Sequence, residues 1–340
     1  MSKIESNRSH RLWMYRNMVK SRAFEDAVKS AYFEGKQPLF NMANGPIPGE
    51  MHLSNGQEPC AVGVCAHLRV DDTVTATHRP HHIAIAKGVD LNRMAAEIFG
   101  KESGLSGGRG GHMHLFDPNV NFTCSGIIGQ GLGPAVGAAL AARMKGSDAI
   151  AVAFLGEGAV NQGAFHEALN LAAVWKAPVV FVIEDNAYGI SVAKRQATAV
   201  ERNADRAVGY RMPGVFVPGN DPDAIYEAAG EAIAHARRGD GPSLLELETT
   251  RLEGHFIGDA EGYRPKGEVA ALRKDDPIPR FRTLLEQDGV TASELERIEK
   301  EADAAVDAAF DFARASSLPP GEAAFAHVFF EGNRSWPTRP

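Results

Sequence analysis

Two groups of polar residues end apolar segments of the sequence, and their chemistry suits a cation. Glu157 stands between Gly156 and Gly158 after the apolar run AIAVAFL, and Asn186 closely follows a second run, PVVFVI. Carboxylate, amide and main-chain oxygens are hard ligands that suit Mg²⁺, and glycines beside the acid let backbone N–H groups approach a diphosphate. Either group alone is more typical of a simple turn, but the pair favours a binding site.

The rest of the pattern predicts the elements that position these residues. Runs typical of strands alternate with Ala-rich helical segments and lie at Thr73–Thr77, Ala149–Leu155, Val179–Ile183 and Ser243–Leu247. The central runs are apolar on both faces, as in a parallel sheet covered by helices on each side, and such sheets bind ligands at the carboxyl ends of their strands. The sequence therefore predicts an α/β fold with a doubly wound parallel sheet, preceded by an amphipathic helix from about Leu12 to Phe33.

Composition excludes several classes of protein. The 340 residues carry 36 Lys and Arg against 43 Asp and Glu without a basic run, so we expect no nucleic-acid or membrane partner. The N-terminus lacks an apolar signal core and the chain has no long apolar span, which predicts a cytoplasmic protein. Cys60, Cys65 and Cys124 form no CxxC pair, and we expect them to be reduced, buried thiols.

Longer stretches, taken in order from about Met14 to Gly321, are similar to one family. They are HLSNGQEPCAVG, HRPHHIAIAKGVD, GGRGGHMHLFD, SGIIGQGLGPAVGAALA, NQGAFHEALNLAAVWK and TTRLEGHFIGDAEGYR. Together with an acid between glycines and a later Asn, they resemble the alpha subunits of thiamine-diphosphate-dependent 2-oxo acid and acetoin dehydrogenases, with the acetoin type looking nearest. The resemblance implies the thiamine diphosphate-binding fold, as a diphosphate-type domain with an N-terminal helical extension.

The domain boundaries follow from this resemblance. We expect a helix and loop extension over residues 1–55, the cofactor-binding α/β domain over 56–275, and a C-terminal helical segment over 276–340 that packs on the same domain. The chain is too short to hold comfortably a second domain of similar size.

The resemblance also implies the ligands of the cofactor, thiamine diphosphate with Mg²⁺. Glu157, Asn186 and the carbonyl of Tyr188 match the metal ligands. Arg79 and Arg251 match arginines that hold the diphosphate, for which a planar guanidinium is well suited.

Further positions match the reacting end of the cofactor. Gly126 and Ile128 match the segment that supports the aminopyrimidine and the bent cofactor. His52, His81 and His255 match histidines that line the reaction centre, where a neutral imidazole can pass protons. His255 is the preferred candidate because it lies in the same TRLEGH loop as Arg251, whereas His81 and His82 are adjacent and at most one should face the cofactor.

A beta subunit should complete the site. In the wider cofactor class an acid on a second type of domain activates the aminopyrimidine, and this chain has room for only one domain type. Gly129, Gly133 and Gly137 recur every fourth residue, which leaves a smooth helix face either for internal packing or for a subunit contact. The resemblance favours a heterotetramer of two alpha and two beta subunits.

Four positions depart from the family pattern. Glu157 stands where Asp is usual and Asp185 where Asn is usual, His78 replaces a common Tyr, and Glu253 takes a position that is often basic or His. The longer acid must fold back to reach a metal at about 2.1 Å, and the added acids predict a more negative phosphate end.

Three functions remain compatible with the sequence. The first is an alpha subunit that acts on acetoin or a 2-oxo acid and passes an acyl group to lipoamide, with a lipoyl acyltransferase core as a further partner. The second is a thiamine-dependent carboligase or decarboxylase that does not use lipoamide. The third is a non-catalytic paralogue whose altered acid no longer binds metal.

Overall fold

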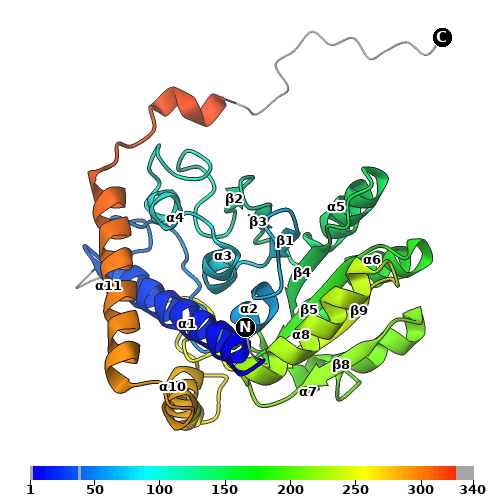
Figure 1. The fold of residues 1–340 in the computed structure, drawn as a ribbon. Coiled ribbons are helices and arrows are strands. Elements are labelled where there is room, and N and C mark those ends of the chain that lie inside the picture. Colours follow the sequence, from blue (N-terminus) through cyan, green and yellow to red (C-terminus); the bar gives the residue numbers. More distant parts are fainter. Residues whose placement is uncertain (1–2, 37–39, 327–340) are drawn as a thin grey trace, which may run out of the picture.

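The computed structural model describes residues 3–36 and 40–326, and their core is a mostly parallel sheet (Figure 1). Within these residues the main sheet has seven strands in the order β2-β3-β1-β4-β5-β9-β8, with only the β2–β3 pair antiparallel. The strands are β1 (Thr73–Ala76), β2 (Phe116–Asp117), β3 (Phe122–Cys124), β4 (Ala151–Gly156), β5 (Val179–Asp185), β8 (Gly214–Val217) and β9 (Ser243–Glu248). This confirms the predicted α/β class with a mostly parallel sheet.

The central strands are apolar on both faces because the sheet separates two cores. In β4, Val152 and Phe154 join one apolar cluster, while the alternating Ala151, Ala153 and Leu155 join the other. β5 divides its side chains in the same way. Side chains of a strand alternate between faces, so a strand buried on both sides reads as the continuous apolar run seen in the sequence.

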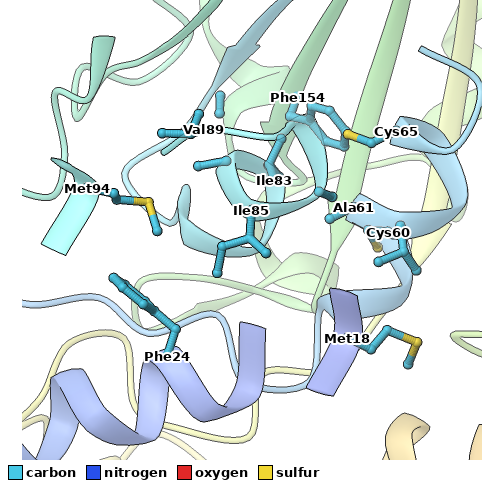
Figure 2. Packing of buried hydrophobic residues seen from close by; sticks show 14 of the residues in the cluster. Met18, Phe24, Cys60, Ala61, Cys65, Ile83, Ile85, Val89, Met94 and Phe154 are labelled. Carbon is cyan, nitrogen blue, oxygen red and sulfur yellow. The ribbon is translucent and has the colours of Figure 1, made fainter. Parts of the chain in front are cut away.

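Helices cover both faces of the sheet. The larger cluster packs β4 against α2 (Glu58–Cys65), α3 (His81–Lys87), α8 (Pro222–Arg237) and α1 (Lys3–Phe33). Figure 2 shows Phe154 of β4 near residues of α2 and α3, with Met18 and Phe24 of α1 beyond them. The smaller cluster packs the other face against α5 (Leu132–Met144) and α6 (Gly163–Trp175).

Two further helices pack beside α1. They are α10 (Pro277–Gln287) and α11 (Ala292–Ala315), and Figure 1 shows them with α1 on the side of the molecule away from α5 and α6. Side chains cap both N-termini, since Asp276 accepts from Ile278 N and Thr291 accepts from Glu294 N. The remaining elements are α4 (Leu91–Ile98), α7 (Lys194–Ala197), α9 (Glu268–Leu272), β6 (Tyr188–Gly189), β7 (Val192–Ala193) and the 3₁₀ helices Ala159–Asn161, Asn203–Tyr210, Arg273–Asp275 and Gly321–Phe325.

The N-terminal helix is longer than the apolar pattern predicted, since α1 begins at Lys3 and not near Leu12. The larger apolar cluster draws on residues from all three expected ranges, 1–55, 56–275 and 276–340, and these boundaries stay a prediction. Residues 327–340 of the last range lie outside the described part of the chain.

Two expectations about solvent and redox environment can be compared with the structure. Cys60, Cys65 and Cys124 are buried, free thiols, as predicted. Among the described helices, none has the length and apolar character to cross a bilayer.

The close packing of α2 on α8 predicts that a larger side chain at Gly63 lowers the stability of the fold. A Cβ on Gly63 would lie 2.4 Å from Ile225 Cγ2 and 3.1 Å from the backbone N of Tyr226. We expect Gly63→Ala to destabilise the protein by about 1–3 kcal/mol, because overpacking a buried contact forces the helices apart. The free energy of unfolding in urea measures this change.

Gly137→Ala is the matched control. Gly137 lies in α5, where a Cβ would have no atom within 4 Å. Alanine should there stabilise the helix by about 0.5–1 kcal/mol through its better helix propensity. Equal effects of the two substitutions on the free energy of unfolding would show that α2 and α8 do not pack as described.

Candidate active site

A cavity of about 650 Å³ opens at the carboxyl ends of the central strands. Its lining comes from the residues that follow β1, β3, β4, β5 and β9, the edge where open parallel sheets bind ligands. Every predicted site residue except one contributes to this lining: His52, Arg79, Gly126, Ile128, Gly156, Glu157, Gly158, Asn186, Tyr188, Arg251 and His255. The exception is His81.

Strand pairing brings the two polar groups of the sequence together. β4 and β5 pair with Gly156 opposite Glu184, so the residues that follow them leave the sheet side by side. The backbone N–H of Asn186 donates to Glu157 Oε2 at 3.4 Å, and the Asn186 side-chain amide donates to Gln57 Oε1 at 3.1 Å. The Asn186 Oδ1 accepts from the N–H of Tyr188 at 3.3 Å.

Glu157 is an unusual carboxylate because it is buried and only partly satisfied. It is 2 % exposed, and among the described residues its Oε1 has no hydrogen-bond partner. Burial, reinforced by the neighbouring Asp185, raises the pKa of Glu157 to about 7. A buried acid with a free oxygen next to an amide and a turn is a donor set that fits a divalent cation.

The added acids have cationic partners, although the negative charge of Asp185 still acts on Glu157, as the sequence-based expectation required. Asp185 forms an ion pair with Lys194, which also binds Glu246 Oε1 at 2.7 Å. Glu253 lies outside the cavity lining, where Lys29 and Arg273 bind it at 2.7 and 2.8 Å. Each extra carboxylate thus has a cationic partner.

The two arginines supply positive charge from buried positions. Arg251 is 1 % exposed and donates through Nη2 to Ile190 O and Tyr263 Oη, while its Nε is buried without a partner among the described residues. Arg79 donates to the carbonyls of Leu53 and His255. Burial and then the charge of Arg251 lower the pKa of Arg79 to about 10, and burial lowers that of Arg251. Burial disfavours the charged form of both guanidinium groups, and an anionic ligand beside them would offset this effect.

Three histidines meet at the same cavity. The ring of His52 lies 4.7 Å from that of His78 and 4.9 Å from that of His255, and the last two are 5.3 Å apart. Burial and the nearby cations lower the pKa of His255 to about 4 and hold the pKa values of His52 and His78 well below the usual range. All three imidazoles are therefore uncharged at neutral pH.

Hydrogen bonding fixes the tautomer of His52. The Nε2 atom of His112 accepts the backbone N–H of His52 at 3.2 Å, and the same Nε2 lies 3.0 Å from His52 Nδ1. Because an amide N–H can only donate, His112 Nε2 must carry a lone pair, and His52 Nδ1 must be the donor. His52 Nε2 consequently has a free lone pair.

His81 does not reach the cavity, which corrects its predicted place in the site. Its ring is fully buried, Nδ1 lies 2.8 Å from Glu25 Oε2, and the ring packs against Phe24 of α1. The adjacent His82 is bonded to Glu184 Oε1 at 2.6 Å and does not line the cavity either. His81 begins α3 and turns toward α1, so it joins the helix packing behind the site.

The glycines of the cavity differ in how much space a side chain would have. A Cβ on Gly126 would lie 3.1 Å from Met113 Sδ, and a Cβ on Gly158 would lie 3.3 Å from the Cα of Gly189. Gly156 has no such neighbour within 4 Å. Ile128, on the loop that begins at Gly126, is 47 % exposed at the cavity. Close packing therefore constrains Gly126 and Gly158.

Sequence reasoning missed several residues that organise the cavity. Gln57 links Asn186 to Glu184, and Lys194 lines the cavity while it neutralises Asp185. The buried carboxylate of Glu97 accepts the N–H groups of Ser106, Gly108, Gly110 and Gly111 and thus shapes the loop that leads to His112. A lone acid in the apolar helix MAAEIFG, followed by SGGRGG, was the available signal for this contact.

Comparison with known proteins agrees with the family seen in the sequence. The family model described as dehydrogenase E1 component matches residues 17–321. The alpha subunit of acetoin:2,6-dichlorophenolindophenol oxidoreductase from Bacillus subtilis is 45% identical over 94% of this chain and 93% of its own length, and that from Cupriavidus necator is 42% identical with the same coverage. The chloroplastic pyruvate dehydrogenase E1 component subunit alpha-3 of rice, Oryza sativa subsp. japonica, is 39% identical over 95% of this chain and 76% of its own length.

These matches cover nearly the whole chain and include the residues that line the cavity. They confirm the family that the sequence motifs resemble. The chain belongs to the dehydrogenase E1 component family, as an alpha subunit of the thiamine-dependent 2-oxo acid and acetoin dehydrogenases.

Proposed function

We propose that this chain is the alpha subunit of an acetoin-cleaving dehydrogenase that binds thiamine diphosphate through Mg²⁺. One observation carries the proposal: a buried acid with an unpartnered oxygen, Glu157, and a buried arginine with an unpartnered Nε, Arg251, line the same cavity. Acetoin is favoured as substrate because the two relatives named for it are 45% and 42% identical, against 39% for the rice subunit named for pyruvate. A 2-oxo acid is the second candidate.

The metal would be held by Glu157, Asn186 and the carbonyl of Tyr188. Asn186 and Glu157 are already in contact, and the turn that carries Tyr188 is fixed by Asn186 Oδ1. Ala187, between them, has a φ of 71°, a conformation that a residue with a Cβ rarely adopts and that is typical of functional turns. A cation there would supply the partner that Glu157 Oε1 lacks.

The diphosphate would lie between the metal and the arginines. Arg251 Nε is free to donate, and Arg79 keeps N–H groups beyond the two that bind carbonyls. Gly156 and Gly158 flank Glu157 at the end of β4 and line the cavity, where the absence of side chains lets the backbone approach a diphosphate. Gly126 and Ile128 would contact the other end of the cofactor.

The histidines would handle protons at the reaction centre. When bound, thiamine diphosphate supplies a carbon nucleophile and an electron sink. His52 offers the lone pair of Nε2, held in place by its bond to His112, and His255 is oriented through its backbone N–H, which donates to Asp259 Oδ2 at 2.8 Å. As uncharged imidazoles, both can accept a proton from substrate and return it. His81 has no part in this proposal.

A beta subunit would complete the site. An open surface is available on α5 and α6, where a Cβ on Gly133 or Gly137 would meet nothing within 4 Å and where Leu171, Val174 and Trp175 are exposed. We propose a heterotetramer of two alpha and two beta subunits in the cytoplasm, which passes an acyl group to a lipoyl acyltransferase. A thiamine-dependent carboligase built on the same pair of subunits is the alternative.

The metal assignment predicts the behaviour of Glu157→Ala. Binding of thiamine diphosphate should require Mg²⁺ in the wild type and weaken by more than about tenfold in the variant, since even the loss of a residue that only supports a metal ligand costs 10–100-fold. Calorimetric titration with and without Mg²⁺ measures this affinity. Glu227→Ala, exposed on α8, is the control for a lost acid elsewhere.

Glu157→Asp tests the length of the acid. The shorter carboxylate is usual in the family and should keep or tighten cofactor binding if the geometry is that of relatives. Unchanged Mg²⁺-dependent binding in Glu157→Ala would remove Glu157 from the metal site and favour the non-catalytic paralogue.

The shared site predicts that the purified chain alone does not turn over acetoin or 2-oxo acids. Activity with an artificial electron acceptor should appear when the chain is co-expressed with its beta subunit. In that complex His255→Ala should lower kcat by about 10²–10⁴-fold, the usual contribution of a positioned acid or base, and change cofactor affinity little. His235→Ala, on the distant helix α8, should leave kcat unchanged.

Two results would contradict this account of catalysis. Turnover by the isolated chain would show that no second subunit is needed. Full activity of the His255→Ala complex would exclude His255 from the reaction.

A further inference from the structure

The three cavity histidines are brought together from distant parts of the chain. His52 precedes α2, His78 follows β1, and His255 lies in the loop after β9. One ring nitrogen of each lies within 4.8 Å of those of the other two, and no other such cluster of three or more His, Cys, Asp or Glu side chains occurs among the described residues. The cluster lines the cavity but shares no residue with the proposed Mg²⁺ ligands.

Each of these imidazoles can act as a ligand. His52 Nε2 has a free lone pair because Nδ1 donates to His112, the arrangement by which metal-binding histidines are usually oriented. His78 Nε2 is buried without a hydrogen-bond partner among the residues that the structure describes. His255 has its backbone, and not its ring, tied to Asp259.

We propose that His52, His78 and His255 form a binding site for one divalent transition-metal ion of the Zn²⁺ class. Imidazole nitrogen suits Zn²⁺, Cu²⁺, Ni²⁺ and Co²⁺, whereas Mg²⁺ prefers oxygen, so the two sites select different ions. Three protein ligands leave a fourth position for water or an anion. A Zn–N distance of about 2.0–2.1 Å separates tetrahedral ligands by roughly 3.4 Å, so the rings need only close inward by side-chain rotation.

Charged groups around the three histidines affect their affinity for a metal ion in opposite directions. Arg79 and Arg251 line the same cavity and oppose a cation there, while the carboxylate of Glu50, also in the lining, favours it. An anion in the fourth position would offset the arginines. The bound ion would occupy the histidines that are proposed to handle protons, so it would inhibit the enzyme.

Binding of Co²⁺, a spectroscopic substitute for Zn²⁺, tests the site directly. The full chain, stripped of metal by a chelator and kept in excess Mg²⁺, should bind one equivalent of Co²⁺ with the intense visible absorption of a tetrahedral complex. Addition of Zn²⁺ should abolish that absorption by displacement. No thiamine diphosphate or substrate is present, so the result does not depend on the proposed function.

Substitution of each histidine tests whether its side chain binds the metal ion. His78→Tyr keeps an aromatic ring at this position, so we expect it to fold, and it should weaken Co²⁺ binding at least tenfold and remove the tetrahedral spectrum. His52→Ala and His255→Ala should do the same, while His235→Ala, a partly exposed histidine on α8, should bind as the wild type does.

The opposite outcomes would overturn the proposal. An octahedral spectrum in the wild type, loss of bound Co²⁺ in excess Mg²⁺, or equal binding in the wild type and His78→Tyr would show that the three histidines do not form this site.

Discussion

The site depends on one constraint, the parallel pairing of β4 and β5. Their register sets Gly156 opposite Glu184, and the following turns must then carry Glu157 and Asn186 out of the sheet at one place. The same strands are buried on both faces, and Glu157, at the end of β4, is itself only 2 % exposed. A buried carboxylate is costly unless it is paired, so a cation bound at Glu157 would stabilise the folded protein.

Burial acts against the charged form of ionisable groups at both ends of the cavity. Burial raises the pKa of Glu157 to about 7 and lowers that of Arg79 to about 10, so each group is pushed toward its uncharged form. A metal diphosphate would bring positive charge to the acid and negative charge to the arginines. By contrast, Asp185 already has a cationic partner in Lys194, which it shares with Glu246.

The sequence was informative where local pattern determines structure. β4 and most of β5 are continuous apolar runs, and the polar residues after them mark the cavity. β3 and β8 are short, and β8 is half exposed, so neither produced a comparable signal. The sequence could not decide how His81 is oriented relative to the adjacent His82. That orientation depends on the direction in which α3 begins, which turns His81 toward α1. The meeting of His52, His78 and His255, and the pairing of Asp185 with Lys194, depend on tertiary contacts that no spacing in the sequence encodes.

The proposal that Glu157, Asn186 and Tyr188 hold the metal is tested most directly by a crystal structure with thiamine diphosphate. Mn²⁺ would take the place of Mg²⁺, so that its anomalous scattering locates the metal. We expect a single strong anomalous peak between the carboxylate of Glu157, the amide oxygen of Asn186 and the carbonyl of Tyr188, in contact with the diphosphate. A peak elsewhere, or a Glu157 side chain that points away from the metal, would contradict it.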